Sequence, residues 1–135
     1  MRSEIDAPLL GAEYEHGVTD CYGLVRRWYW QVRGLVLPDF PRSPEWWEHG
    51  GDLFTENFRS VGFKAVPLTT SPELGDVLLM PIASRSGVPN HSAVYVGADT
   101  ILHHLPKQLS RREGLPRYWP RVTHLLRFRG THGQG

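Results

Sequence analysis

Cys21 is the only cysteine of this 135-residue chain, and its side chain offers the clearest chemistry in the sequence. A single thiol forms no internal disulfide and no multi-thiolate zinc site, so it is either a buried structural residue or a nucleophile. It follows Thr19 and Asp20, either of which can cap a helix, so we expect the thiol at the first or second helical position. There the free backbone N–H groups and the helix dipole would favour a thiolate over a thiol.

A nucleophilic thiol needs a base within hydrogen-bond reach, and the base needs a third group that holds its ring. His91 opens a predicted strand at 91–96 and could point across the end of the sheet toward the start of the Cys21 helix. The next predicted strand, 100–105, contains both His103 and His104. His103 and His104 are therefore the two candidates for the residue that orients His91.

The length of the connection between these two strands decides which histidine shares a face with His91. A three-residue loop at 97–99 would place His103 there, whereas a loop of two or four residues would place His104 there. We favour three residues, with Asp99 in the left-handed conformation, so His103 is the predicted orienting residue.

The same residue types allow two plainer interpretations. Either histidine taken alone is typical of a buried structural residue, and the combination with Cys21 is what favours catalysis. Cys21, His91 and His103 could also supply three ligands to zinc. Asp20, next to Cys21, is interpreted as a helix cap, and no other Asp or Glu near them in sequence is a candidate for the general base of a metalloenzyme, so we expect no metal and no other cofactor.

The elements around these residues predict an α+β fold, with helices first and a mainly antiparallel sheet second. A helix is predicted from Cys21 to about Arg33, with Gly34 as its stop, because apolar residues recur there at helical spacing. Three prolines interrupt 35–50, although a short helix fits 45–49, and Asp52 is the expected cap of a helix closed by Gly62. Strands are predicted at 63–68, 74–80, 91–96, 100–105 and near 122–129.

Composition narrows the class of protein. The chain has fifteen basic and fourteen acidic residues, so its overall charge predicts no nucleic-acid partner. No apolar run reaches the roughly 20 residues that span a bilayer, and residues 1–10 lack the apolar core of a signal peptide. We expect a single domain at 1–130, a disordered tail at 131–135, and no insertion into membranes.

Four blocks, taken in order, resemble the NlpC-type cell-wall cysteine peptidases, a papain-like group that cuts peptide bonds in peptidoglycan stems. They are residues 20–23, 74–78 and 91–97, together with His103, which follows His91 at the family's spacing. Residues 37–42, Trp46-Trp47 and 101–105 are further similar to the tail assembly protein K group of long-tailed phages. The resemblance covers roughly residues 9–129 and implies a papain-like fold.

The resemblance also implies roles for individual residues. Cys21 would be the nucleophile, His91 the general base and acid, and His103 the orienting residue. The backbone N–H of Cys21 would hold the oxyanion, together with Tyr14 or, as an alternative, His16.

Three aromatic residues are expected around the substrate. Tyr22 stands where relatives often have serine or tryptophan, which would alter the substrate floor. Trp46 and Trp47 would flank the groove or dock onto the tail, with core packing expected for one of them.

The implied function is that of a phage or prophage tail-tip endopeptidase acting on peptidoglycan stems, at the bond between D-Glu and a diamino acid. Its partners would be that peptide substrate and the hub proteins of the tail tip or baseplate. The chain would be made in the host cytoplasm without a signal peptide and end at the virion tail tip. Two rival interpretations are a non-catalytic adaptor or plug that keeps the fold, and an amidase on the same fold.

Overall fold

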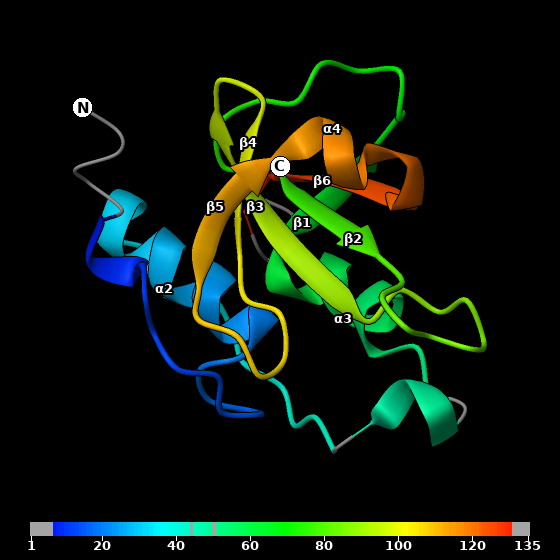
Figure 1. Ribbon diagram of the computed structural model, residues 1–135. Coiled ribbons are helices and arrows are strands. Elements are labelled where there is room, and N and C mark those ends of the chain that lie inside the picture. The colour runs from blue at the N-terminus through cyan, green and yellow to red at the C-terminus, as the bar shows by residue number, and fades with distance from the viewer. Residues whose placement is uncertain (1–6, 44, 50, 131–135) are drawn as a thin grey trace.

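The structure is a computed structural model that describes residues 7–43, 45–49 and 51–130, so the expected tail at 131–135 lies outside the described residues (Figure 1). The helical elements are η1 (Ala7–Leu9), α2 (Cys21–Arg33), η2 (Trp46–His49), α3 (Leu53–Val61), α4 (Leu115–Tyr118) and η3 (Trp119–Arg121). The strands are β1 (Phe63–Val66), β2 (Val77–Met80), β3 (His91–Gly97), β4 (Thr100–His103), β5 (Arg111–Gly114) and β6 (His124–Phe128). The predicted α+β order is confirmed. None of the described helices is long and apolar enough to cross a membrane.

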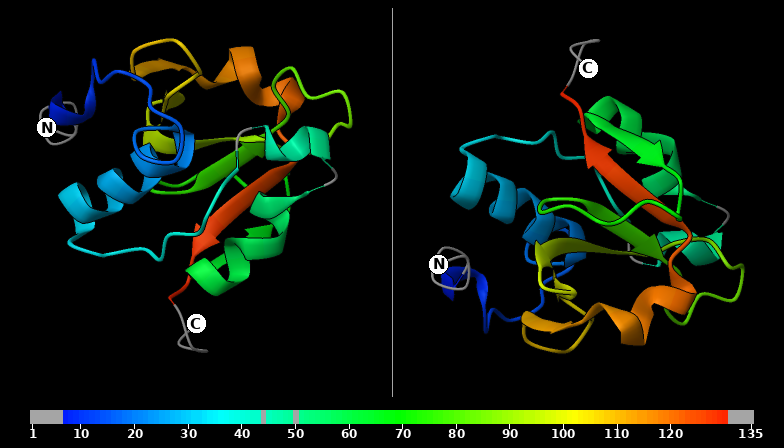
Figure 2. Two further views of the ribbon diagram at one scale, coloured as in Figure 1. Left: turned by 90° about the horizontal axis from the view of Figure 1, so that it is seen from below. Right: turned by 90° about the horizontal axis from the view of Figure 1, so that it is seen from above.

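The six strands form one antiparallel sheet in the order β1-β6-β2-β3-β4-β5. Helices α2 and α3 cover one face, and the short α4 and η3 cover the other (Figure 2). Alternate residues of β2 therefore enter two different apolar clusters: Val77 and Leu79 face α2, while Leu78 and Met80 face α4. Burial on both faces explains why this strand reads as a continuous apolar run.

The helix that carries the cysteine has the predicted bounds. Asp20 caps its start, because Oδ1 accepts the Gly23 N–H at 2.8 Å, and Gly34 ends it in the left-handed conformation with φ of 66°. Helix α3 also ends at the predicted glycine, Gly62. The expected side-chain cap from Asp52 is absent, since its side chain makes no capping hydrogen bond.

The β3–β4 hairpin has the predicted pairing but reaches it by a different turn. Ala93 lies opposite His103 as expected. The turn has two residues, Ala98 and Asp99, with φ of 51° and 53°, and a register shift between Tyr95 and Gly97 adds one residue to β3. The extra residue restores the parity that a two-residue turn alone would have changed, so His103 still shares the face of His91.

Strand β5 and helix α4 are additions that the sequence patterns did not predict. Strand β5 lies at the edge of the sheet and pairs with β4, with Arg111 opposite His103 and Glu113 opposite Ile101. This register places Glu113 on the same face as His103, because its partner Ile101 lies two residues before His103 on β4.

Candidate active site

Cys21 lies at the first position of α2 and lines a pocket of about 130 Å³. Its side chain is only 6% exposed, and Sγ lies 3.9 Å from the carbonyl oxygen of Asn90, the residue before His91. The pocket draws on the segment before α2, the aromatic segment before α3 and the start of β3. The residues that line it include Tyr14, His16, Asp20, Cys21, Arg42, Trp46, Trp47, Asn90 and His91.

A hydrogen-bonded chain of three side chains runs away from this pocket. Nε2 of His91 lies 2.9 Å from Nδ1 of His103, and Nε2 of His103 lies 2.8 Å from Oε1 of Glu113. Because His91 uses Nε2 for this contact, its Nδ1 is the nitrogen left for the thiol. The structure thus brings the three residues predicted from the sequence to one place and adds a carboxylate behind them.

Glu113 is held by four neighbours. Oε1 accepts hydrogen bonds from His103, from the Tyr118 hydroxyl at 2.8 Å and from Nε of Arg111 at 3.0 Å, while Oε2 accepts one from Nη1 of Arg117 at 3.1 Å. Burial alone would raise the pKa of Glu113, but the bonds from Tyr118, His103 and Arg111 lower it to about 2. Glu113 is therefore a fixed carboxylate at neutral pH.

This charge state assigns the tautomers of both histidines. Burial lowers the pKa of His103, which Glu113 only partly offsets, and burial together with His103 holds the pKa of His91 well below 6.5. Both rings are therefore neutral. An ionised Glu113 only accepts, so His103 donates from Nε2; its Nδ1 must then accept, and His91 donates from Nε2. The lone pair of His91 therefore remains on Nδ1, the nitrogen that a general base would use.

The expected resting thiolate is not supported. Burial raises the pKa of Cys21 to about 11, and the negative charge of Asp20 acts in the same direction. The helix start is present as predicted, but desolvation beside a carboxylate outweighs the favourable N–H groups. Cys21 and His91, which line the same pocket, are therefore both neutral at rest, so any reaction of the thiol would require a base to take its proton.

A neutral thiol gives a distinct alkylation profile. Only the thiolate reacts with iodoacetamide, and a pKa of about 11 leaves roughly one thiol in ten thousand ionised at pH 7. We expect the alkylation rate of Cys21 to rise about tenfold per pH unit between pH 6 and 9. The measurement is mass spectrometry of time points, with the urea-unfolded chain as the control for an ordinary thiol. A plateau below pH 8 in the folded protein would contradict the neutral thiol.

Tyr14 and His16 both reach the pocket, as the alternative oxyanion assignments require. Burial raises the pKa of Tyr14, and the nearby Cys21 raises it further, so its hydroxyl keeps its proton and remains a donor. The ring of Tyr14 packs edge-on against His104, which lies outside the His91–His103 contact. His16 is committed elsewhere, because its Nε2 donates to the carbonyl of Arg42 at 2.8 Å. Tyr14 is thus the better placed of the two.

A backbone donor is also free at the start of α2. The N–H of Cys21 donates to no acceptor within the part of the chain that the structure describes, as is usual in the first turn of a helix. It lies beside the pocket that Tyr14 lines, so a backbone amide and a phenol could share an oxyanion.

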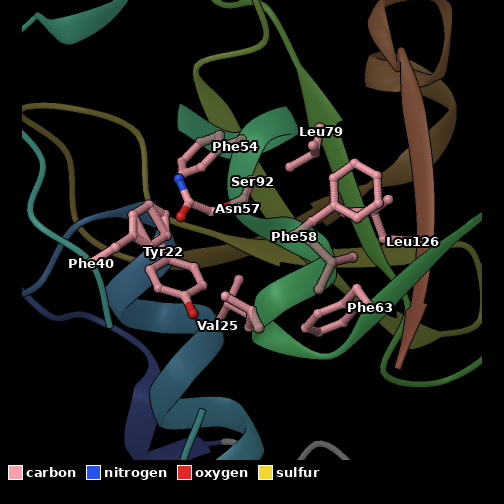
Figure 3. Close-up of a pocket in the computed structure, with 12 residues that line it drawn as sticks. Tyr22, Val25, Phe40, Phe54, Asn57, Phe58, Phe63, Leu79, Ser92 and Leu126 are labelled. Carbon is pink, nitrogen blue, oxygen red and sulfur yellow. The ribbon is translucent and has the colours of Figure 1, made fainter. Parts of the chain in front are cut away.

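The aromatic residues divide between two cavities. Trp46 and Trp47 line the cysteine pocket, with rings edge-on at 5.5 Å, and Trp46 is also buried against Phe54. Tyr22 does not line that pocket, which corrects its predicted place at the substrate floor. Its ring gathers with Phe40 and Phe54 at one end of a separate small apolar cavity of about 30 Å³ (Figure 3), and its hydroxyl donates to the carbonyl of Pro38.

A buried ion pair fixes the start of α2. Nε and Nη2 of Arg42 donate to the two carboxylate oxygens of Asp20 at 2.9 and 3.1 Å, and both side chains are at most 3% exposed. Arg42 also binds Asp39 through Nη1 at 2.7 Å. Burial alone would raise the pKa of Asp20, but the bonds from Arg42 and Gly23 hold it below its usual value. The proline-rich segment is thereby fastened to the residue before the cysteine.

Loss of this ion pair should destabilise the fold in a pH-dependent way. Arg42→Gln leaves the Asp20 carboxylate buried without its partner, which costs about 3–5 kcal/mol. The lowered pKa of Asp20 contributes stability above pH ~4, which is lost as the pH falls through the folded-state pKa. In the variant that pKa rises instead, so the difference from wild type should be largest at pH 7 and smaller near pH 4.5.

Urea unfolding at the two pH values measures this difference. The matched control is Arg129→Gln, because Arg129 is exposed and its side chain has no hydrogen bond or ion pair with a described residue. Its effect should stay within about 0.5 kcal/mol. Equal destabilisation by Arg42→Gln at pH 7 and 4.5 would show that the Asp20 charge is not what the arginine supports.

The geometry does not favour the zinc interpretation. Within residues 7–43, 45–49 and 51–130, no group of three His, Cys, Asp or Glu side chains is arranged to hold a metal ion. The ring nitrogens of His91 and His103 instead face one another.

The sequence profile of the NlpC/P60 family matches residues 11–128. The chain is 46% identical over 118 residues to "Tail tip assembly protein K" of Escherichia phage lambda, covering 87% of this chain and 57% of the relative. It is 28% identical over 131 residues to the protein of the same name from Escherichia phage N15, covering 95% and 52%. The chain thus spans about half the length of these curated relatives. The NlpC/p60 domain of the peptidoglycan hydrolase SagA has the same fold, with a TM-score of 0.63, 16% identity, and coverage of 94% of this chain and 96% of that domain.

Proposed function

Because this chain belongs to the NlpC/P60 family, we propose that it is a cysteine peptidase that hydrolyses peptide bonds of peptidoglycan stems. The observation that carries the proposal is the aligned chain from the Cys21 pocket through His91 and His103 to Glu113. Each member has the protonation state that a nucleophile, a base and two orienting groups need. A structural role alone requires neither the order of these groups nor their tautomers.

The first half of the reaction forms a thioester. Sγ of Cys21 attacks the carbonyl carbon of the scissile amide while Nδ1 of His91 takes the thiol proton. The resulting imidazolium is stabilised through His103 by the carboxylate of Glu113. The oxyanion accepts hydrogen bonds from the backbone N–H of Cys21 and from the hydroxyl of Tyr14.

The second half regenerates the enzyme. His91 gives its proton to the leaving amine as the C–N bond breaks, which leaves the acyl group on Cys21. With its lone pair restored, His91 then takes a proton from water, and the hydroxide attacks the thioester. The acid product departs, and the sulfur recovers its proton.

The biological setting follows from the tail proteins that this chain resembles. The similarity to two proteins named tail tip assembly protein K supports a place at the tip of a phage or prophage tail. There the enzyme would meet tail hub proteins and open the cell wall during entry, or act during tail assembly. The favoured bond joins D-Glu to the diamino acid of the stem. Trp46 and Trp47, which line the cysteine pocket, would flank the bound peptide.

Digestion of purified peptidoglycan tests this function. Mass spectrometry of the soluble products should show new amino termini on the diamino acid, which identifies the D-Glu–diamino acid bond. Release of intact stem peptides from the sugar would instead indicate an amidase. No products from a folded wild-type protein, over a range of pH and peptidoglycan types, would favour the adaptor interpretation and contradict the peptidase.

A further inference from the structure

A third cavity, of about 210 Å³, lies on the α4 side of the sheet. In both views of Figure 2 the elements that build it, α4 with η3 and the loop after β2, lie close together. Its lining combines apolar side chains with three arginines. The lining residues are Ile82, Leu105, Gln108, Arg111, Arg117, Tyr118 and Arg121.

The cavity has an excess of positive charge. Arg111 and Arg117 each bind Glu113, so one carboxylate is shared by two guanidinium groups. Each guanidinium has five N–H donors, so neither is saturated by that contact. Arg121 has no hydrogen bond or ion pair within the described part of the chain, and Glu113 is the acid that bonds the other two. Three cations and one anion around a hollow favour a bound anion.

The cavity adjoins the cysteine pocket. Ile82 lines both, and the consecutive residues Leu105 and Pro106 line one each. Asn90 fixes the shared wall, because its side chain bonds both the N–H and the carbonyl of Ile82, at 2.7 and 2.8 Å. A ligand that extends from Cys21 past Ile82 would therefore reach the arginines.

We propose that this cavity, referred to below as the arginine pocket, is a subsite for a carboxylate of the peptide substrate. The inference rests on the proposed peptidase function and extends it to substrate recognition. Guanidinium groups bind carboxylates through paired N–H donors, and the apolar side chains of Ile82 and Leu105 would contact the carbon skeleton that bears the carboxylate. This mixed lining suits an acidic amino acid better than a bare inorganic anion.

The test measures binding to the Cys21→Ala protein, which cannot turn the substrate over. The probe is the stem tripeptide L-Ala-γ-D-Glu-diaminopimelate, compared with the same tripeptide carrying carboxamides in place of its carboxylates. Isothermal titration calorimetry should show tighter binding of the acidic peptide by about tenfold or more. Adding Arg121→Gln should remove most of that difference and leave the amidated peptide unaffected. Arg129→Gln, outside the pocket, should change neither affinity.

Each outcome has a defined meaning. Equal affinity for the two peptides, or an unchanged preference in Arg121→Gln, would overturn the subsite. Inorganic phosphate binding that depends on Arg121 and is as tight as the acidic peptide would also overturn it, because the pocket would then be a general phosphate site. If the wild-type protein cleaves no stem peptide but the Arg121-dependent preference is present, the peptidase proposal fails and the carboxylate site stands.

Discussion

Cys21→Ala is expected to lower peptidoglycan hydrolysis by at least about 10⁴-fold, to the level of the buffer, because the variant has no group that can form the acyl intermediate. The backbone N–H at the start of α2 and the Tyr14 hydroxyl remain, but they stabilise an oxyanion that no nucleophile generates. The measurement is loss of turbidity of purified sacculi, together with chromatography of the released peptides. Persistent clearing of sacculi by the variant would rule out the thiol mechanism.

The fold should survive this substitution, which keeps the result interpretable. Alanine removes one buried sulfur and leaves the Asp20 cap and its ion pair with Arg42 unchanged. We expect a loss of about 1 kcal/mol in the free energy of unfolding, measured in urea. A second pair of variants distinguishes loss of a catalytic group from a general effect of replacing a histidine. His91→Gln should be as inactive as Cys21→Ala, whereas His124→Gln, on β6, should keep wild-type activity.

Much of the scaffold could be predicted because its signals are local. The helix from Cys21 to Arg33 has both a cap and a glycine stop, and its core face repeats at helical spacing. The pairing of β3 with β4 was predicted correctly, but the turn between them was not. The turn is one residue shorter than expected, and the register shift in β3 compensates for the missing residue. The face of β4 on which His103 lies was therefore predicted correctly.

Glu113, the carboxylate that bonds His103, could not be predicted from a local sequence pattern. Strand β5 has the sequence Arg-Arg-Glu-Gly, which carries no alternation of apolar and polar residues and reads as a solvated turn. It is a strand because it pairs along the open edge of β4, a contact that no local pattern encodes. No sequence pattern therefore singles out Glu113, and the predicted site ends at His103.

Charged side chains from separate parts of the sequence account for the remaining differences between the expected and the observed site. Asp20 was correctly read as a helix cap, but its second partner, Arg42, comes from a segment of prolines 22 residues away. The same carboxylate, together with burial, raises the pKa of Cys21 and reverses the expected ionisation of the thiol. Position at a helix start indicates which residue can be a nucleophile, while its charge state depends on what the fold packs around it.

Glu113→Gln is expected to lower kcat by about 10–100-fold, because Glu113 assigns the proton on both histidines. A glutamine amide can offer His103 either an oxygen or an N–H group. In the second orientation His103 accepts at Nε2, donates from Nδ1, and forces His91 to carry its proton on the nitrogen that should receive one. The variant also loses the negative charge that stabilises the imidazolium of His91 during attack.

Two readouts separate this positioning role from a merely structural one. The ¹⁵N shifts of the imidazole nitrogens should report a single tautomer for His91 and His103 in the wild-type protein, and a mixture in Glu113→Gln. Glu73→Gln is the matched control, since Glu73 is an exposed glutamate that pairs with Arg127 away from the site, and it should leave kcat and the tautomers unchanged. Wild-type kcat in a folded Glu113→Gln protein, with unaltered imidazole shifts, would show that the carboxylate only fastens β5 to α4 and that the tautomers are set elsewhere.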